Sequence, residues 1–214
     1  MSEIKAIIFD MDGVILDTET ICDRAWELVA KEQNIKNPKE AIALCRGCNK
    51  TDSAQILKNY FGKDFDSEFF LQRSSYYSHK IADEEGIPLM PYAKEALDYL
   101  SKKYIIALAS STREAVVRKE LSDAELLDYF KTLTCGDMVV HSKPDPEIYL
   151  KACNSIGINP ENCAAIEDSP NGVKSACSAG IKTIMVPDKV QPTEELEKIL
   201  WKCCKSLKEV KELL

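Results

Sequence analysis

Two aspartates one residue apart follow the first strongly apolar run of the chain. The run is Ala6–Phe9, and Asp10 and Asp12 come after it, before Gly13. Two carboxylates this close repel each other, so both stay charged only beside a cation or with a shared proton. Taken alone, the segment is also typical of an ordinary solvated turn. The pair becomes informative when the ends of the other apolar runs are compared with it.

Polar side chains of matching chemistry follow three later apolar runs. Ser110–Thr112 supplies hydroxyls in front of a helical pattern, Lys143 stands before a proline, and Glu167-Asp168 forms another acidic pair. Ligands of open α/β sheets bind outside the carboxyl ends of the strands, so we expect these segments to meet at one edge of a sheet. A helix N-terminus beside the hydroxyls favours an anion.

The combination fits metal-assisted phosphoryl transfer. Oxygen ligands from Asp10, Asp12 and Asp168 suit Mg²⁺, with water and a substrate phosphate completing its octahedron. Ser110 and Lys143 suit phosphate oxygens, the first as a hydrogen-bond donor and the second as a point charge. An aspartate is already charged at neutral pH and can form an aspartyl-phosphate. We therefore expect Mg²⁺ as the cofactor and a small phosphorylated metabolite as the partner.

The apolar runs themselves predict a parallel sheet. They are short and continuous rather than alternating, which is typical of strands covered on both faces. The expected strands are Ala6–Phe9, Tyr104–Ala109, Thr132–Cys135, Cys163–Ile166 and Thr183–Val186. Helical patterns lie between the later runs, at Tyr92–Lys102, Asp145–Ile156 and Asn171–Ala179. Strands alternating with helices indicate an α/β fold with a doubly wound parallel sheet.

The segment from residue 18 to residue 83 has a different character. It shows helical patterns only, such as Thr20–Lys31 and Asp66–Ala82. We therefore predict two domains: an α/β catalytic core of residues 1–17 and 84–214, and a smaller all-helical cap of residues 18–83. The tail Thr193–Leu214 is amphipathic and is expected to pack on the edge of the sheet.

Composition argues against several classes of protein. The chain has 214 residues, of which 28 are basic and 35 acidic, and its formal net charge of −7 argues against a general nucleic-acid binder. The longest stretches without a charged residue, Tyr104–Thr112 and Ala152–Pro160, are much shorter than the roughly 20 residues of a membrane-spanning helix. The N-terminal segment does not fit a secretory signal. We expect a cytoplasmic protein, with a monomer as the default state.

Nine cysteines are scattered along the chain, several of them inside apolar segments. Without a secretory signal, an odd number of cysteines favours reduced, buried thiols over a disulfide framework. Cys45 and Cys48 have the spacing of a redox motif, but no strand-to-helix context surrounds them, and two thiols cannot complete a tetrahedral zinc site. The sequence leaves a redox role of this pair open.

Together, four segments resemble motifs I to IV of the haloacid dehalogenase (HAD) superfamily. They are, in chain order and each at a strand end, Asp10-x-Asp12-Gly-Val, Ser110, Lys143 and Glu167-Asp168. The helical insert after the first strand is similar to the cap of the β-phosphoglucomutase-like branch of that superfamily. The resemblance implies a Rossmann-like HAD core, a magnesium cofactor and an aspartyl-phosphate mechanism.

The resemblance also implies a role for each motif residue. Asp10 would attack phosphorus, and Asp12 would act first as general acid and then as general base. Asp10, the backbone carbonyl of Asp12 and Asp168 would hold Mg²⁺, with Glu167 as a further ligand or just behind the ligands. The transferring phosphoryl group would be bound by Ser110, the backbone amide of Ser111 and Lys143. True dehalogenases of the superfamily lack the second acid, so dehalogenase chemistry is not expected here.

The cap is expected to choose the substrate, and its residues differ from those of a mutase. β-Phosphoglucomutases resemble this chain around Asp17-Thr18, but they carry a histidine where Cys22 stands and an arginine where Lys50 stands. Lysine keeps the positive charge but loses the bidentate fork of arginine. They also place an asparagine at the position of Glu114, which here follows Arg113.

These departures favour a phosphatase of a sugar phosphate or similar metabolite over a phosphosugar mutase. Thr18, Lys50 and Arg113 are the candidates for contacts with the rest of the substrate. A β-phosphoglucomutase-type mutase is the alternative, and a non-catalytic binding protein is a more remote one. A lost nucleophile or metal ligand would indicate the binding protein, and the sequence shows neither loss.

Overall fold

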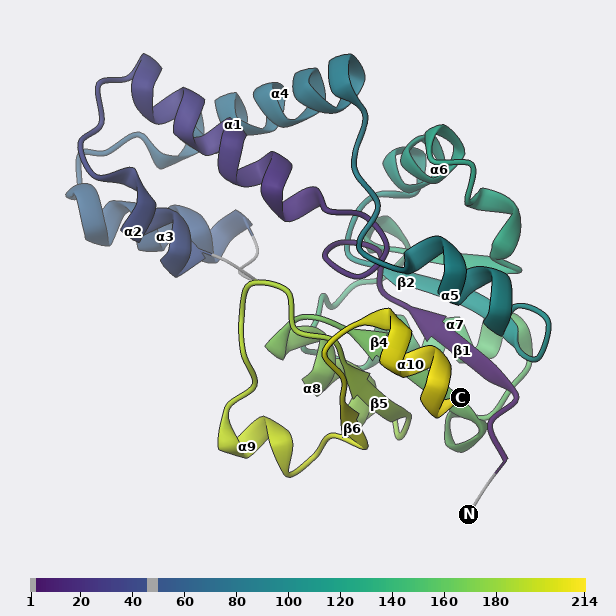
Figure 1. Ribbon diagram of the computed structural model, residues 1–214. Coiled ribbons are helices and arrows are strands. Elements are labelled where there is room, and N and C mark those ends of the chain that lie inside the picture. Colours follow the sequence, from purple (N-terminus) through teal and green to yellow (C-terminus); the bar gives the residue numbers. More distant parts are fainter. Residues whose placement is uncertain (1–2, 46–49) are drawn as a thin grey trace. The chain divides into compact units, whose positions relative to one another are not determined.

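The computed structural model describes residues 3–45 and 50–214 and divides into two compact units (Figure 1). The sheet unit comprises Met1–Asp17 and Pro88–Leu214, and the helical unit comprises Thr18–Ile87. The helical unit begins where the sequence predicted, but it ends at Ile87 rather than at residue 83. The reason is that helix α4 (Ser67–Glu85) runs past residue 83, until Gly86 at φ 76° ends it.

The sheet unit is built on a parallel sheet with the strand order β3-β2-β1-β4-β5-β6 (Figure 1). Its strands are β1 (Ala6–Phe9), β2 (Ile105–Ser110), β3 (Thr132–Cys135), β4 (Cys163–Glu167), β5 (Lys182–Met185) and β6 (Lys202–Cys203). The predicted α/β fold is confirmed, and the first five strands lie on the predicted apolar runs. Strand β6 was missed because its two residues are exposed, so no apolar run marks it.

Strand β1 lies in the middle of the sheet, and all four of its residues are fully buried. The strand order runs from β1 through β2 to β3 on one side and through β4 to the remaining strands on the other. Such a reversal of direction opens a crevice outside the carboxyl ends of the central strands. Asp10, the residue that follows β1, is therefore placed at this crevice.

Helices cover both faces of the sheet, as continuous apolar strands require. They are α5 (Ala93–Leu100), α6 (Glu114–Asp123), α7 (Glu147–Ile156), α8 (Pro170–Ser178), α9 (Glu194–Glu197) and α10 (Leu207–Leu213), with short 3₁₀ turns η1 (Leu127–Tyr129), η2 (Gly136–Met138) and η3 (Pro160–Asn162). Buried residues of α7 and α8 form one apolar cluster with Ala6 and Ile8 of β1. The packing of α7 on the sheet fixes the segment that also carries Lys143.

The helical unit has its own apolar core. Its helices are α1 (Thr18–Glu32), α2 (Pro38–Cys45), α3 (Lys50–Phe61) and α4 (Ser67–Glu85). Val29 of α1, Leu57 of α3 and Phe70 of α4 are buried in one cluster. At the start of α4, the side chain of Asp66 accepts a hydrogen bond from the amide of Phe69, as expected of an N-cap. Within the described part of the chain, no helix is long and apolar enough to cross a membrane.

The tail of the chain belongs to the sheet unit. The tail, predicted to pack at the sheet edge, consists of α9, β6 and α10, and β6 extends the sheet beside β5. None of the eight described cysteines is assigned to a disulfide. Cys45 is buried and its sulfur contacts the backbone oxygen of Ser53, whereas Cys48 lies outside the described residues. The redox hypothesis for the pair therefore stays a hypothesis.

Candidate active site

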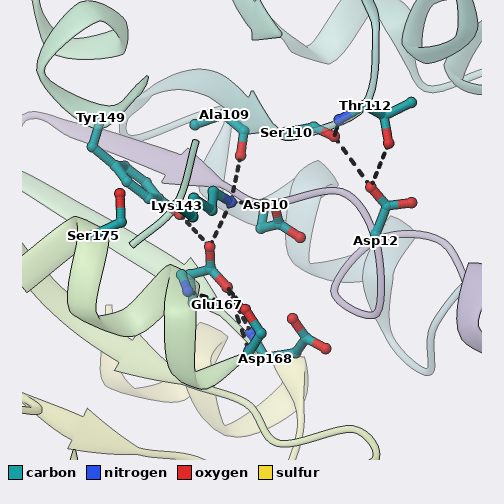
Figure 2. A network of polar contacts seen from close by, with 12 residues as sticks. Asp10, Asp12, Ala109, Ser110, Thr112, Lys143, Tyr149, Glu167, Asp168 and Ser175 are labelled. Carbon is teal, nitrogen blue, oxygen red and sulfur yellow. Dashed lines mark hydrogen bonds and ion pairs between the residues drawn. The ribbon is translucent and has the colours of Figure 1, made fainter. Parts of the chain in front are cut away.

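The carboxyl ends of β1, β2 and β4, with the loop before α7, bring most of the predicted site residues together. Figure 2 shows a network of polar side chains in which carboxylates surround the ammonium group of Lys143. The network includes Asp10, Asp12, Ser110, Lys143, Glu167 and Asp168. The sequence analysis predicts that these side chains lie close together, because the carboxyl ends of parallel strands meet at the same edge of a sheet.

Lys143 connects three of the strand ends. Its Nζ donates to Asp10 Oδ1 at 2.6 Å, to Glu167 Oε1 at 2.6 Å and to the backbone oxygen of Ala109 at 3.0 Å (Figure 2). The exposed fraction is 8% for the side chains of Lys143 and Asp10 and 0% for that of Glu167. Removing one partner from such a buried ion pair leaves an uncompensated charge and is strongly destabilising. The ammonium group is thus part of the charge balance of the site.

Asp12 is held separately, by hydroxyl groups from the end of β2. Its Oδ2 accepts hydrogen bonds from Ser110 Oγ and from Thr112 Oγ1, both at 3.1 Å. The amide of Thr112 in turn donates to Ser110 Oγ at 3.0 Å. Ser110 is therefore oriented toward Asp12, and its hydrogen must turn away from Asp12 before it can reach a phosphoryl oxygen. Thr112 contacts a predicted catalytic residue that the sequence analysis did not connect with it.

The Glu167 carboxylate accepts hydrogen bonds at both oxygens. Oε1 accepts from Lys143 and, at 2.7 Å, from the hydroxyl of the buried Tyr149. Oε2 accepts from the amide of Asp168 at 3.2 Å and from the amide and hydroxyl of Ser169 at 3.4 and 3.2 Å. A carboxylate offers about four lone-pair sites, so these donors fill its acceptor capacity. Glu167 is consequently anchored by the protein itself.

Two glycines make room for the carboxylates. A Cβ atom on Gly172 would lie 1.9 Å from Glu167 Oε1, and one on Gly13 would lie 2.4 Å from Asp168 Oδ2. Gly13 also has φ at 72°, a conformation that disfavours residues with a side chain. Both positions therefore depend on glycine, because the acidic side chains occupy the space where a side chain would begin.

An acidic cluster of this site has the composition of a divalent-cation site. Asp10, Glu167 and Asp168 each offer one carboxylate oxygen, and these oxygens lie within 4.8 Å of one another. Oxygens on one Mg²⁺ ion lie about 3–4 Å apart, given Mg–O distances of about 2.0–2.1 Å, so small movements would bring the group onto an ion. The Asp12 carboxylate is not in the cluster, which leaves its backbone carbonyl as the group that the resemblance assigned.

Burial changes the protonation of the central groups. Burial raises the pKa of Asp10 from 3.8 to about 8, against the opposing effect of Lys143, and the charges of Glu167 and Asp12 raise it further. The pKa of Lys143 is raised above its ordinary value, because the attraction of Asp10 and Glu167 outweighs burial, which lowers it. Burial, together with the charge of Glu167, raises the pKa of Tyr149 well above its ordinary value. Lys143 therefore stays charged and Tyr149 stays a hydrogen-bond donor at neutral pH.

The remaining predicted residues lie outside this network. Ser111 is exposed at the end of β2, and Arg113 is exposed at the N-cap of α6. The Glu114 carboxylate pairs with Arg118 at 2.7 Å, one helical turn along. The other two belong to the helical unit and are the first residues of their helices, Thr18 of α1 and Lys50 of α3.

Three residues near the site were missed by the sequence analysis. Thr112 was visible as part of a hydroxyl-rich segment, but its partner was not. Tyr149 lies within the predicted helical pattern Asp145–Ile156 and belongs to the buried apolar cluster, so its residue type and position give no sign of a polar contact. Glu120 of α6 gave no signal. Its Oε2 is buried and has no hydrogen-bond partner among the described residues, and burial followed by the charge of Asp12 raises its pKa to about 7.

Comparison with known proteins gives matches along most of the chain. The family model for haloacid dehalogenase-like hydrolases matches residues 7–186. A phosphorylated carbohydrates phosphatase of Thermotoga maritima is 34% identical over 181 residues, which cover 84% of this chain and 83% of that protein. The β-phosphoglucomutase of Bacillus subtilis is 30% identical over 189 residues, covering 85% and 83%. A crystal structure from T. maritima, provisionally assigned as a β-phosphoglucomutase, covers 99% of this chain and 100% of its own, with a TM-score of 0.79 and 30% identity.

These matches confirm the relationship inferred from the motifs. The matched region includes Asp10, Lys143 and Glu167. The relatives are named as phosphatases and as a phosphoglucomutase, so this chain is an enzyme of the phosphatase and phosphomutase type. The similarity in sequence and the similarity in fold both extend through the sheet unit and the helical insert. The chain belongs to the haloacid dehalogenase-like hydrolase family.

Proposed function

We propose that the protein is a Mg²⁺-dependent phosphatase that hydrolyses a small phosphorylated carbohydrate through an aspartyl-phosphate on Asp10. The observation that carries the proposal is the position of the Lys143 ammonium, 2.6 Å from the Asp10 carboxylate, beside the acidic cluster. A nucleophilic oxygen, a fixed cation and oxygen ligands for a metal ion thus lie within one buried site. Phosphoryl transfer depends mainly on such positioning and on charge stabilisation.

Magnesium fits this site through Asp10, Asp168 and the backbone carbonyl of Asp12. Glu167, whose oxygens already accept hydrogen bonds from the protein, orients Lys143 and the Asp168 backbone behind these ligands. When bound, the ion supplies positive charge to the phosphoryl oxygens. The role of this chain is to hold the ligands and to keep the surrounding carboxylates in place.

The first half-reaction uses Asp10 and Asp12. An oxygen of Asp10 forms a bond to phosphorus while the bond between phosphorus and the leaving oxygen breaks in line with it. Asp12 gives a proton to the leaving oxygen, which departs as an alcohol. Lys143 and Ser110 hold the oxygens of the transferring group, Ser110 after its hydroxyl has turned from Asp12. Thr112 keeps Asp12 in position during this exchange.

The second half-reaction regenerates the enzyme. Asp12, now ionised, takes a proton from a water molecule, and the water oxygen bonds to phosphorus. The bond between phosphorus and Asp10 breaks, so phosphate leaves and Asp10 again carries its negative charge. Asp12 acts as acid in one step and as base in the other, which requires that it approach both oxygens from a fixed place. The hydroxyl of Thr112 supplies that restraint while Ser110 holds the phosphoryl group.

The proposed substrate is a phosphorylated sugar or polyol, because the similar T. maritima protein is named for phosphorylated carbohydrates. The B. subtilis relative favours a second candidate, a phosphosugar mutase. A phosphatase is preferred because a mutase must hold a second phosphate, and Lys50, at the position where mutases carry an arginine, lacks the bidentate fork of that residue. Thr18, Lys50 and Arg113 stay candidates for substrate contacts. A cytoplasmic, monomeric state without nucleic-acid binding also stays a prediction.

The test is phosphate release from p-nitrophenyl phosphate and a panel of sugar and polyol phosphates. The wild type and Asp10→Asn are assayed with Mg²⁺ and with a chelator. We expect release that needs Mg²⁺ and that falls at least about a thousandfold in Asp10→Asn, because an amide oxygen is a poor nucleophile. The matched control is Asp128→Asn, which changes an exposed aspartate of the same unit and should leave release unchanged.

Product analysis separates the two enzyme classes. β-Glucose 1-phosphate that yields free phosphate supports the phosphatase. Accumulation of glucose 6-phosphate without free phosphate, in the presence of glucose 1,6-bisphosphate as primer, contradicts it and identifies a mutase. Release that survives Asp10→Asn contradicts the aspartyl-phosphate mechanism for either class.

A further inference from the structure

Tyr149 contacts both members of the central ion pair. Its hydroxyl donates to Glu167 Oε1 at 2.7 Å, the same oxygen that Lys143 contacts, and the Lys143 Nζ lies 5.2 Å from the centre of its ring (Figure 2). Its side chain is fully buried, with an exposed fraction of 0%. A buried aromatic ring at this distance also favours the ammonium group electrostatically. The ring of Tyr149 therefore lines the site of the Lys143 ammonium group, and its hydroxyl donates to Glu167.

The segment that carries Lys143 is fastened at both ends. On one side, the carboxylate of Glu147 accepts hydrogen bonds from the amides of Val140 and His141 at 2.9 and 2.8 Å. On the other side, Ser175 of α8 donates to the backbone oxygen of Asp145 at 2.5 Å. The backbone around Lys143 is thus fixed. The freedom that remains in this part of the site belongs to the lysine side chain and to the acceptors that it uses.

All three N–H groups of Lys143 are engaged in the structure. They point to Asp10, to the backbone of Ala109 and to Glu167. An ammonium group has three donors, so Lys143 must release one acceptor when it binds a phosphoryl oxygen. Glu167 Oε1 is the acceptor that already has a second donor, the hydroxyl of Tyr149. When Lys143 turns away, Glu167 keeps a partner and the buried carboxylate is not left without a donor on that oxygen.

We propose that Tyr149 is a positioning residue that lets Lys143 exchange Glu167 for the phosphoryl oxygen. The inference rests on the phosphate-binding role of Lys143 in the proposed function. Without the phenol hydroxyl, release of Lys143 would leave Glu167 Oε1 unpaired in a buried site, which is costly. Lys143 would then stay on Glu167, and the phosphate would bind more weakly.

The test compares Tyr149→Phe with the wild type in two binding measurements that need no turnover. The affinity for inorganic phosphate is measured by titration calorimetry in the presence of Mg²⁺. The affinity of the phosphate-free protein for Mn²⁺ is measured from the electron paramagnetic resonance signal of the unbound ion. We expect the dissociation constant for phosphate to rise about tenfold, the effect of one hydrogen bond to a charged group, and that for Mn²⁺ to change less than twofold.

The control is Tyr104→Phe, which removes a hydroxyl that donates to the Leu214 backbone at 2.8 Å in the same unit. It should leave both affinities unchanged. Wild-type phosphate affinity in Tyr149→Phe overturns the inference, and a lower melting temperature with unchanged phosphate affinity shows a structural role only. Loss of Mn²⁺ affinity equal to the loss of phosphate affinity also overturns it, because Tyr149 would then act through the metal ligands. Turnover by the wild type tests the proposed function separately.

Discussion

Glu120 is a half-buried carboxyl group that destabilises the folded protein at neutral and alkaline pH. One of its oxygens is buried without a hydrogen-bond partner among the described residues, and burial, with the nearby charge of Asp12, raises its pKa from 4.5 to about 7. An unfolded chain leaves this group near its ordinary pKa. The folded state therefore holds a proton that the unfolded state has lost between about pH 4.5 and pH 7.

The sign and size of the effect follow from linkage. Because the folded state binds more protons in this window, the free energy of unfolding falls as pH rises from 4.5 to 7 and then levels off. A difference of about 2.5 pKa units corresponds to about 3 kcal/mol. Glu120 is partly exposed, so solvent screening reduces this to about 1–2 kcal/mol. Glu120→Gln removes the charge and should stabilise the protein by that amount at pH 8 and by almost nothing at pH 4.5.

Urea unfolding at several pH values between 4.5 and 8, in the presence of a chelator, measures this difference. Asp10 also titrates with a raised pKa in this range, but it does so in both proteins and cancels from the comparison. The matched control is Glu95→Gln, which changes an exposed glutamate on α5 of the same unit and should have a small effect at every pH. A stabilisation by Glu120→Gln that is equal at pH 4.5 and pH 8, or absent at pH 8, refutes the reasoning.

Three further substitutions test the packing of the site. Lys143→Met leaves two buried carboxylates without their cation and should lower the free energy of unfolding, measured with urea, by about 3–5 kcal/mol at pH 8. The loss should be smaller at pH 5, because Asp10 is protonated there. Gly172→Ala places a Cβ 1.9 Å from Glu167 Oε1 and should cost about 1–3 kcal/mol and weaken Mn²⁺ binding; an unchanged melting temperature contradicts this. Gly136→Ala places a Cβ 2.0 Å from the Ser111 backbone oxygen, so we expect a displaced β2 end and at least about a tenfold loss of kcat/KM.

Much of the sheet unit could be predicted because buried parallel strands leave an unambiguous signal. The runs at β1 and β2 are continuous, apolar and bounded by polar residues, and β1 is fully buried as this pattern requires. Strand β6 could not be predicted, since its two exposed residues pair with β5 only through the backbone. The end of the helical unit was placed too early because α4 continues through charged residues, where the apolar pattern fades before the helix does.

The sequence predicted the site residues that lie at the common edge of the parallel strands. It could not predict the residues whose role depends on contacts between distant parts of the chain. Asp10 follows β1, Glu167 ends β4 and Lys143 lies in the loop between β3 and α7, so the common edge of a parallel sheet brings them together. Tyr149 lies in the middle of a helix, and its position in the apolar stripe is the same whether its hydroxyl has a partner or not. Only the fold reveals that Glu167 is that partner. Glu120 is hidden for the same reason.

The charges of the site favour the proposed binding of a metal ion together with a phosphate group. Asp10 and Glu167 are buried beside Lys143, so two carboxyl groups share one ammonium group, and both belong with Asp168 to the acidic cluster. Burial is the main reason that the pKa of Asp10 is raised, and the charges of Glu167 and Asp12 raise it further, so the carboxyl group retains its proton at neutral pH. A divalent cation on the acidic cluster favours the ionised form and lowers that pKa. In the proposed mechanism, the charge that ionises Asp10 at neutral pH would also offset, together with Lys143, the negative charge of the incoming phosphate.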